Sequence, residues 1–530
     1  DAEGWLSQNG ARPFFLFLHL YDLHTPYVLP QRVAARYGKP AYNSELRYVD
    51  DVLGEFTDFL KDRGLFDKSL IVFTSDHGES LSEHGESTHG YFIYQSTLRV
   101  PLVFHWPRTA AVKPARVSEP VSLLDVAPTL LELLRIPSPP QFQGRGLLSL
   151  ASGKATAAQE EIYSESLYPH RHFGASALRA IRRGSLKYIQ APRPELYDLS
   201  RDPGESHNLY AESRPLAAAL HERLTALLSR YAMTSKQPRT GPPPEVVERL
   251  NSLGYAAVSS SSASPPDSGP DPKDRLQAYE DYGRGLALSS AGKLTEANAL
   301  LEGLLARTPD LVDVRLSLGL GQQKLGLQED AARTFQQVLK SDPANALAHF
   351  DLGASELALH RLDGAMREFD LALAIEPYYT RAEDLLARAL LDQRKFDTAR
   401  AHFEHVLTVD PADYAAHYNL GVLDAMQQRW ADAERHLTAA LEADPASAEA
   451  HNTLGSVYLQ RRDLDRAAAQ FAGAIELQPK SAASHYNLGL VLLAKGDRAS
   501  AAREFQRALS ADPQFRSARE ALDRLESGPK

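Results

Sequence analysis

Three short polar segments near the start of the chain combine the side chains that hold metal ions and oxyanions. Asp22 and His24 directly follow one apolar run, and Asp76 and His77 directly follow a second. His89 lies in a polar loop that leads to a third apolar run. An Asp-His pair can bind a divalent cation, and further histidines can contact a charged substrate or protonate a leaving group. These residue types predict a metal and oxyanion site.

Each of these residues also has a simpler structural interpretation. An Asp-His pair after a strand fits a turn closed by local hydrogen bonds, and Asp22 can satisfy the backbone of its own turn. Glu79 and Glu83 are most simply solvated loop carboxylates, and His84 has no special claim to a role. Residue type alone leaves the metal site and the turn as alternatives.

The segments that must position these residues alternate between strand and helix patterns. Strand-like runs at residues 14–20, 70–74 and 100–104 are separated or followed by helical patterns at 44–63 and 123–134. Such alternation is typical of an α/β domain with parallel strands, whose ligands bind beyond the carboxyl ends of the strands. Residues 1–232 are therefore expected to form an α/β domain.

The pattern changes after about residue 155, where short strands replace the alternation. The expected strands cover residues 161–164, 177–181, 186–189 and 195–197, and the expected helix covers 214–231. This order predicts a small antiparallel subdomain at the end of the domain.

Motifs in a fixed order extend over about the first 230 residues. They are Asp22–Tyr27, Ser75–Glu79, Thr88–Gly90, Arg99–Pro101, Asp125–Leu130, Gly144–Leu148, Glu195–Leu199 and Asp202–Glu205. This series resembles the sulfatase family of the alkaline-phosphatase superfamily. The fold that the resemblance implies is a partial α/β sulfatase-like domain with a small antiparallel C-terminal subdomain.

The resemblance also implies a reaction and roles for individual residues. Sulfatases hydrolyse sulfate esters with one divalent metal, usually calcium, and with a formylglycine nucleophile made from Cys or Ser. Asp76 and His77 match two of the metal ligands. His24 matches the histidine that contacts the sulfate group, and His89 stands where a basic side chain contacts the substrate oxygens.

The sequence departs from the family at the nucleophile. The chain has no cysteine. The serine starts Ser118-Glu119-Pro120 and Ser213-Arg214-Pro215 both lack the arginine, because the first has Ser122 in its place and the second has Ala217. The family's first pair of metal-binding aspartates also has no match. The chain begins with Asp1 rather than Met. We therefore expect the C-terminal part of a sulfatase domain, inactive alone, with the formylglycine motif upstream.

His77 leaves the metal and the ester open. Many arylsulfatases have asparagine at this position, whereas related phosphate and phosphonate monoesterases have histidine. Calcium prefers oxygen ligands, and imidazole suits manganese or zinc. The alternatives are a phosphate or phosphonate ester hydrolase, a phosphoryl transferase, or a catalytically inactive binding protein.

The second half of the chain repeats every 34 residues. The repeated prolines are Pro309, Pro343, Pro377, Pro411, Pro445, Pro479 and Pro513. The repeated alanines are Ala297, Ala331, Ala365, Ala399, Ala433, Ala467 and Ala501, each followed four residues later by leucine or phenylalanine. The pattern resembles the tetratricopeptide repeat, seven units over residues 278–515, which stack as helix pairs into an all-α superhelix. A Pro/Ser-rich linker at 233–277 precedes the array, and a capping helix is expected in 516–530.

Tetratricopeptide arrays are protein-interaction scaffolds, so a protein or peptide partner is expected on the array. Repeat position places Phe350, Tyr418, Asn452 and Tyr486 on the concave groove. The alternative is that these side chains pack between adjacent first helices.

Composition excludes several other classes of protein. The net charge of −10 argues against a nucleic-acid partner. No apolar run approaches the roughly 18 residues of a membrane span. The absence of cysteine excludes disulfides and thiolate metal sites. The resemblance is compatible with an exported or periplasmic protein, and the sequence leaves the compartment open.

Overall fold

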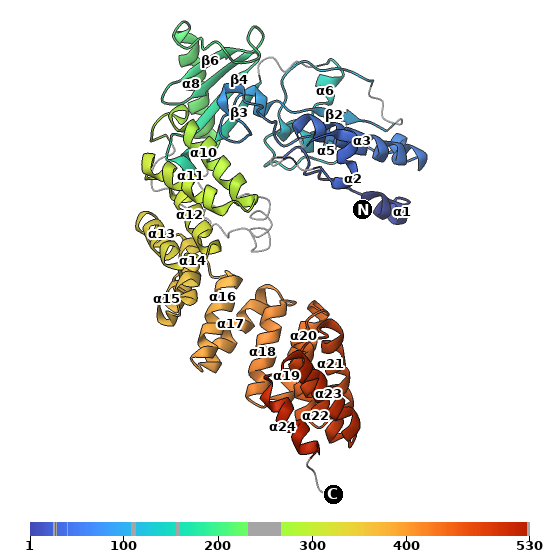
Figure 1. Ribbon diagram of the computed structural model, residues 1–530. Coiled ribbons are helices and arrows are strands. Elements are labelled where there is room, and N and C mark those ends of the chain that lie inside the picture. Colours follow the sequence, from blue (N-terminus) through green and yellow to red (C-terminus); the bar gives the residue numbers. More distant parts are fainter. Residues whose placement is uncertain are drawn as a thin grey trace. The chain divides into compact units, whose positions relative to one another are not determined.

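The computed structural model describes residues 1–24, 27, 29–39, 41–107, 113–154, 160–231 and 267–526 (Figure 1). These residues fall into two compact units. The first unit holds the described residues up to Tyr231 together with 267–321, and the second begins at Gln322. Most of the expected linker, residues 233–277, lies outside the described residues.

The first unit begins with helices around a two-stranded sheet. The helices are α1 (Ala2–Asn9), α2 (Gln31–Tyr37), α3 (Tyr42–Asp62), α4 (Gln95–Leu98), α5 (Val126–Leu134) and α6 (Leu148–Ala151). Strands β1 (Ile71–Thr74) and β2 (Leu102–His105) pair antiparallel, with Phe73 opposite Val103. The expected helices at 44–63 and 123–134 thus correspond to α3 and to a 3₁₀ turn continued by α5.

Two expectations for this region are wrong. β1 and β2 run antiparallel rather than parallel, because the chain returns through residues 75–101 and lays β2 alongside β1. Residues 14–20 form no strand, and Phe15 and Phe17 are largely exposed. A strand needs a neighbour to pair its backbone N–H and C=O groups, and no described segment pairs with this run.

A second sheet follows, and its four strands are all antiparallel. Its elements are β3 (Glu161–Ser166), α7 (Tyr168–Phe173), β4 (Leu178–Arg183), β5 (Leu186–Gln190), β6 (Glu195–Asp198) and α8 (Arg214–Tyr231). The strand order β3-β4-β5-β6 is a simple meander. The expected small antiparallel subdomain and its helix are confirmed.

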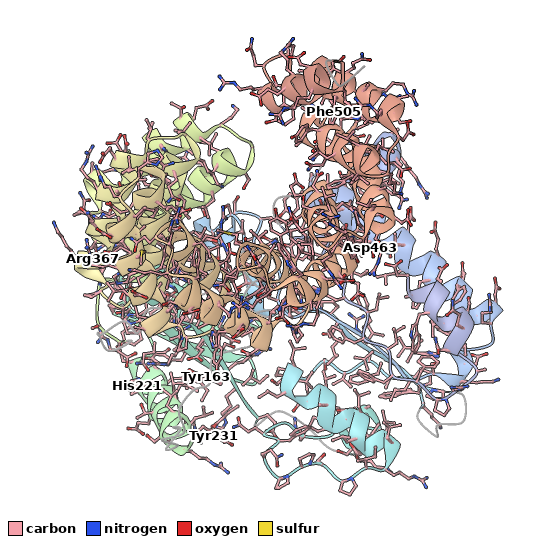
Figure 2. The ribbon with its side chains drawn as sticks, turned by 90° about the horizontal axis from the view of Figure 1, so that it is seen from below. Tyr163, His221, Tyr231, Arg367, Asp463 and Phe505 are labelled. Carbon is pink, nitrogen blue, oxygen red and sulfur yellow. The ribbon has the colours of Figure 1, made fainter. Side chains whose placement is uncertain are left out.

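Both faces of this sheet are buried, each against a different part of the chain. Ile181, Tyr188 and Leu196 point to one face and pack with α8. Figure 2 labels Tyr163 of β3 and His221 of α8, whose elements meet on this side. The residues next to them in sequence, including Ala180 and Ile189, point to the other face because side chains alternate along a strand.

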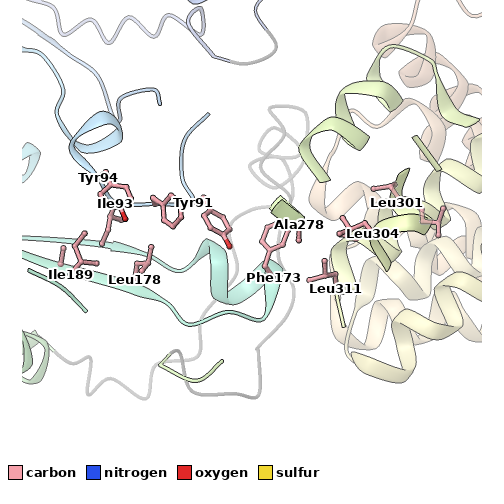
Figure 3. Packing of buried hydrophobic residues seen from close by; sticks show 14 of the residues in the cluster. Tyr91, Ile93, Tyr94, Phe173, Leu178, Ile189, Ala278, Leu301, Leu304 and Leu311 are labelled. Atoms are coloured by element: carbon pink, nitrogen blue, oxygen red, sulfur yellow. The ribbon is translucent and has the colours of Figure 1, made fainter. Parts of the chain in front are cut away.

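The other face carries a cluster that joins distant parts of the first unit. Tyr91, Phe92, Ile93 and Tyr94 are all at most 4% exposed and pack on it. The same cluster contains Ala278, Leu301, Leu304 and Leu311 from the first helical repeat, several of which are labelled in Figure 3. The first repeat is thus packed into the same compact unit as the sheet.

The helical repeats form a run of helices that pack as pairs within each unit, followed by a final helix. The helices are α10 (Pro272–Ser290), α11 (Leu294–Arg307), α12 (Val312–Lys324), α13 (Gln328–Ser341), α14 (Ala346–Ala358), α15 (Leu362–Ile375), α16 (Thr380–Asp392), α17 (Phe396–Val409), α18 (Tyr414–Met426), α19 (Trp430–Ala443), α20 (Ala448–Gln460), α21 (Leu464–Leu477), α22 (Ala482–Ala494), α23 (Arg498–Ala511) and α24 (Arg516–Glu526). Among the described residues, no helix combines the length and hydropathy that a membrane-spanning segment requires.

The sequence period corresponds to the packing within each helix pair. Every repeated alanine and every leucine or phenylalanine four residues later is at most 2% exposed. A Cβ atom on Gly489 would lie 2.5 Å from Cε1 of Phe505, which Figure 2 labels. The glycine of the first helix is therefore required by the close approach of the ring on the second helix.

The close approach predicts that Gly455→Ala destabilises the array. Its Cβ would lie 2.8 Å from Cε1 of Phe471, so the ring must move within a filled core. The free energy of unfolding of the second unit should fall by about 1–3 kcal/mol, measured by urea unfolding.

Gly473→Ala in α21 is the matched control from the same repeat. Its Cβ would meet its nearest neighbour, Nδ1 of His451, at an ordinary 3.4 Å. This variant should be neutral or stabilise by up to about 1 kcal/mol, because alanine is the better helix former. Equal effects of the two substitutions would contradict the packing argument.

Candidate functional site

Three histidines from separate segments of the first unit lie together. The rings of His77 and His89 are stacked with centroids 4.0 Å apart. The ring of His24 meets that of His89 edge-on, at 4.9 Å. Asp76 adjoins His77, with its Oδ2 3.8 Å from the Nε2 atom of His77. The structure brings together His24, Asp76, His77 and His89.

The Asp76-His77 pair is held at the end of β1 by a tight set of local hydrogen bonds. The Ser75 hydroxyl donates to the His77 carbonyl at 2.6 Å, and the Gly78 N–H donates to the Thr97 carbonyl at 2.8 Å. The His77 Nδ1 atom lies 2.9 Å from the Gly78 carbonyl. This contact requires the proton on Nδ1, which leaves the Nε2 lone pair available as a ligand.

His24 lies on a strained turn that α3 supports. Leu23 has a φ of 77°, in the left-handed region that side chains other than glycine rarely occupy. Its N–H donates to Oε2 of Glu45 on α3 at 3.0 Å, and Glu45 is 2% exposed. His24 Nδ1 lies 3.2 Å from the Tyr21 hydroxyl. The buried carboxylate on α3 thus helps to fix the direction of the turn that carries His24.

Glu79 is a member of the site, and its interpretation as a solvated loop carboxylate is wrong. Its side chain is 5% exposed, and Oε2 lies 3.0 Å from His89 Nδ1. Its other oxygen, Oε1, is buried and has no hydrogen-bond partner within the part of the chain that the structure describes. Burial, followed by the charges of Glu79 and Glu45, raises the pKa of Tyr27 to about 12. A buried carboxylate thus orients His89 and keeps one oxygen unpaired.

The donor set fits part of a divalent-metal site. An exposed Asp76 carboxylate and the Nε2 atom of His77 supply two donors side by side. In the described ranges, no third His, Asp or Glu joins them in a group that could hold a metal ion. Two ligands do not complete the four to eight that divalent cations take in proteins. Asp76 and His77 therefore fit as two of the ligands that a divalent cation would need, and the described residues do not supply the rest.

The loop that carries His89 is anchored by a second buried carboxylate. Oε1 of Glu86 accepts the Tyr91 N–H at 2.8 Å and the Phe92 N–H at 3.3 Å. Burial raises the pKa of Glu86 to about 7, against these hydrogen bonds and the nearby His89, while the negative charge of Glu280 adds to the rise. His84, two residues before Glu86, stacks on Tyr94 with ring centroids 3.6 Å apart and lies outside the histidine group.

The four residues expected on the groove of the array make contacts within the second unit. Phe350 is 3% exposed and lies 4.9 Å from the ring of Tyr379, yet it also lines a hollow of about 290 Å³. Asn452 donates to the Ser484 hydroxyl at 2.6 Å. Tyr418 stacks on Tyr414 at 5.8 Å, and Tyr486 packs on Phe505 at 5.7 Å and Phe515 at 5.3 Å. Packing thus accounts for much of their surface.

Family models match both halves of the chain. Residues 1–136 match the model described as Sulfatase, and residues 83–230 match N-sulphoglucosamine sulphohydrolase, C-terminal. Residues 316–380, 385–448, 425–482 and 452–515 match the tetratricopeptide repeat. The N-terminal part of the chain therefore carries sulfatase-family domains, and tetratricopeptide repeats follow them.

Curated relatives agree with this assignment. The chain is 28% identical over 280 residues to human Arylsulfatase D, covering 44% of this chain and 46% of that protein. It is 27% identical over 266 residues to an N-acetylgalactosamine-6-O-sulfatase of Bacteroides thetaiotaomicron, covering 43% and 50%. The chain thus spans about half the length of the curated relatives it matches.

Among solved structures, the array is similar to a tetratricopeptide repeat protein from Parabacteroides merdae. The identity is 18% and the TM-score 0.38, with 47% of this chain and 100% of that chain covered.

The raised pKa of Glu86 predicts a pH-dependent stability of the first unit. Between pH 4.5 and about 7 the unfolded chain loses the proton that folded Glu86 keeps, so stability falls as the pH rises. Glu86→Gln removes this loss. The variant should gain up to about 3 kcal/mol relative to wild type between about pH 5 and pH 8, measured by urea unfolding.

Glu83→Gln on the same loop should show the opposite sign. A hydrogen bond from the Leu81 N–H lowers the pKa of Glu83, so wild type gains stability above the unfolded pKa and loses it in acid. Glu83→Gln should be less stable than wild type at neutral pH and equally stable in acid. A difference in stability between Glu86→Gln and wild type that does not change with pH would contradict the raised pKa of Glu86.

Proposed function

We propose that the complete protein is a metal-dependent hydrolase of sulfate esters joined to a protein-interaction scaffold. The observation that carries this proposal is the convergence of His24, His77 and His89 beside Asp76, at the places where the sulfatase motifs put them. Family membership of the N-terminal part supports the reaction class.

Asp76 and His77 would hold the divalent cation. A bound divalent cation would polarise the ester oxygens and offset charge that develops in the transition state. Asp76 offers an exposed carboxylate, and the Nδ1 contact of His77 leaves Nε2 to ligate. Calcium is the family's usual ion, and the imidazole ligand makes manganese or zinc the alternative.

His24 and His89 would contact the anionic group of the substrate. A sulfate or phosphate monoester brings a negative charge that must be stabilised as the bond to the leaving group breaks. Glu79 accepts from His89 Nδ1, which leaves the Nε2 atom of His89 free to face the substrate. The buried Glu79 supports the orientation of His89 rather than touching the ester.

The nucleophile and the remaining metal ligands would come from polypeptide outside this sequence. The relatives are about twice as long as the part that this chain matches. Phe15, Phe17, Phe73 and Val103 are between 45% and 83% exposed, and apolar surface of this kind is normally covered in a finished domain. A formylglycine motif in that polypeptide would complete the site.

Loss of Asp76 should abolish metal binding and turnover together. Asp76→Ala in the complete protein should lower aryl sulfate hydrolysis by about 100-fold or more and reduce bound metal, measured by enzyme assay and elemental analysis. Asp58→Ala is the control, because Asp58 is 73% exposed and pairs with Lys61 on α3, outside the site.

The substrate panel separates the alternatives. Aryl sulfates and aryl phosphates are assayed with calcium, manganese or zinc after chelation of the resident metal. Preference for phosphate with manganese or zinc would favour the phosphate ester hydrolase that His77 allows. Wild-type protein that binds metal but hydrolyses neither ester would overturn the hydrolase and leave the phosphoryl transferase and the inactive binding protein.

A further inference from the structure

The first helix of the repeat array contacts the loop that carries His89. The Tyr279 hydroxyl of α10 lies 2.5 Å from the Thr88 hydroxyl and 3.2 Å from the His89 carbonyl, to which it donates. Glu280 accepts the Ser87 N–H at 2.9 Å and the Ser87 hydroxyl at 2.6 Å. Two consecutive residues of α10 thus bind the three residues that end in His89.

The aromatic ring of Tyr279 is seated in the shared core of the first unit. It lies 4.6 Å from the ring of Tyr91 and 5.9 Å from the ring of Phe173. The Tyr91 hydroxyl donates to the Pro272 carbonyl at the start of α10 at 2.7 Å. Figure 3 shows Tyr91, Phe173 and Ala278 in line within this cluster. The packing of the ring therefore fixes the position of the Tyr279 hydroxyl.

The repeat pattern does not require these two residues. At the register of Glu280, the later repeats have small or apolar buried residues, which are Val314, Ala348, Ala382, Ala416, Ala450 and Ser484. At the register of Tyr279 they have Asp313, Leu347, Arg381, Ala415, Glu449 and Ala483, with no aromatic residue. The contacts with the His89 loop therefore account for a tyrosine and a glutamate that the repeat pattern does not supply.

We propose that Tyr279 and Glu280 are positioning residues that hold His89 in place for the sulfate or phosphate ester. The inference rests on the proposed function for the role of His89, and the contacts themselves are independent of it. The Glu79 contact fixes the His89 ring, while α10 fixes its backbone. The first repeat is thereby part of the hydrolase site's support as well as the start of the scaffold.

The test compares Tyr279→Phe and Glu280→Ala with wild type in the complete protein. Small displacements of a group that contacts the transition state lower turnover more than substrate binding. Each variant should lower kcat by about tenfold with little change in KM. Glu280→Gln, which keeps one acceptor for Ser87, should restore much of the lost turnover.

Tyr282→Phe is the matched control on the same helix. Its hydroxyl contacts Ser317 at 3.0 Å and not the loop, so kcat should stay at the wild-type value. Hydrogen exchange supplies a readout that needs no activity. Residues 84–91 should exchange faster in Tyr279→Phe and Glu280→Ala than in wild type or Tyr282→Phe.

The outcomes separate the two proposals. Active wild type with unchanged kcat in both variants overturns the positioning role and leaves the hydrolase intact. Inactive wild type overturns the hydrolase, and unchanged exchange at residues 84–91 then overturns the positioning role as well. If Tyr279→Phe does not fold, kcat and hydrogen exchange at residues 84–91 in Glu280→Ala, whose substitution lies near the surface, test the positioning role.

Discussion

The first unit depends on the burial of one short segment, Tyr91 to Tyr94, between the four-stranded sheet and the first helical repeat. A buried segment must have its backbone polar groups paired. Lys187, itself 1% exposed, donates to the Ile93 carbonyl at 2.5 Å and to Glu205 at 2.6 Å. Burial lowers the pKa of Lys187, and the charge of Glu205 opposes that shift. Because a buried ion pair is costly unless its partners are in place, the Lys187 contacts favour this arrangement of the segment over others.

The position of the segment from Tyr91 to Tyr94 also fixes the site, because the His89 loop runs directly into it. Glu86 holds the start of the segment through backbone N–H groups, and Glu205 accepts the Gln95 N–H at its end at 2.5 Å. The rings of His77 and His24 then meet His89 from β1 and from the turn that α3 supports. The site is thus assembled from loops that are anchored to the buried segment and to α3, rather than by the short β1–β2 sheet alone.

The sequence predicted the parts that depend on local pattern. The 34-residue period places a buried alanine and a buried leucine or phenylalanine in every repeat, because each helix pair solves the same packing problem. The motif order identified the sulfatase-family part and its four histidine and aspartate candidates, which lie together. It missed the antiparallel pairing of β1 with β2, because a run of apolar residues does not encode its partner. It also missed Glu79, whose burial arises only when the His24, His77 and His89 segments meet. Tyr279 and Glu280 lie about 190 residues from the loop that they contact, and no spacing rule joins them to it.

The register of the repeats explains how two different folds share one core. In a stack, each first helix presents small residues to its neighbours, as Ala348 and Ala416 do in the later repeats. The first repeat of the array has the sulfatase-family part beside it within the same compact unit. At that register α10 carries Glu280, which reaches a polar loop, and one residue earlier Tyr279, whose ring extends the aromatic cluster. A glutamate in place of a small residue exchanges close helix contact for hydrogen bonds to an irregular surface. The same helix therefore closes the repeat array and supports the loop of the candidate site.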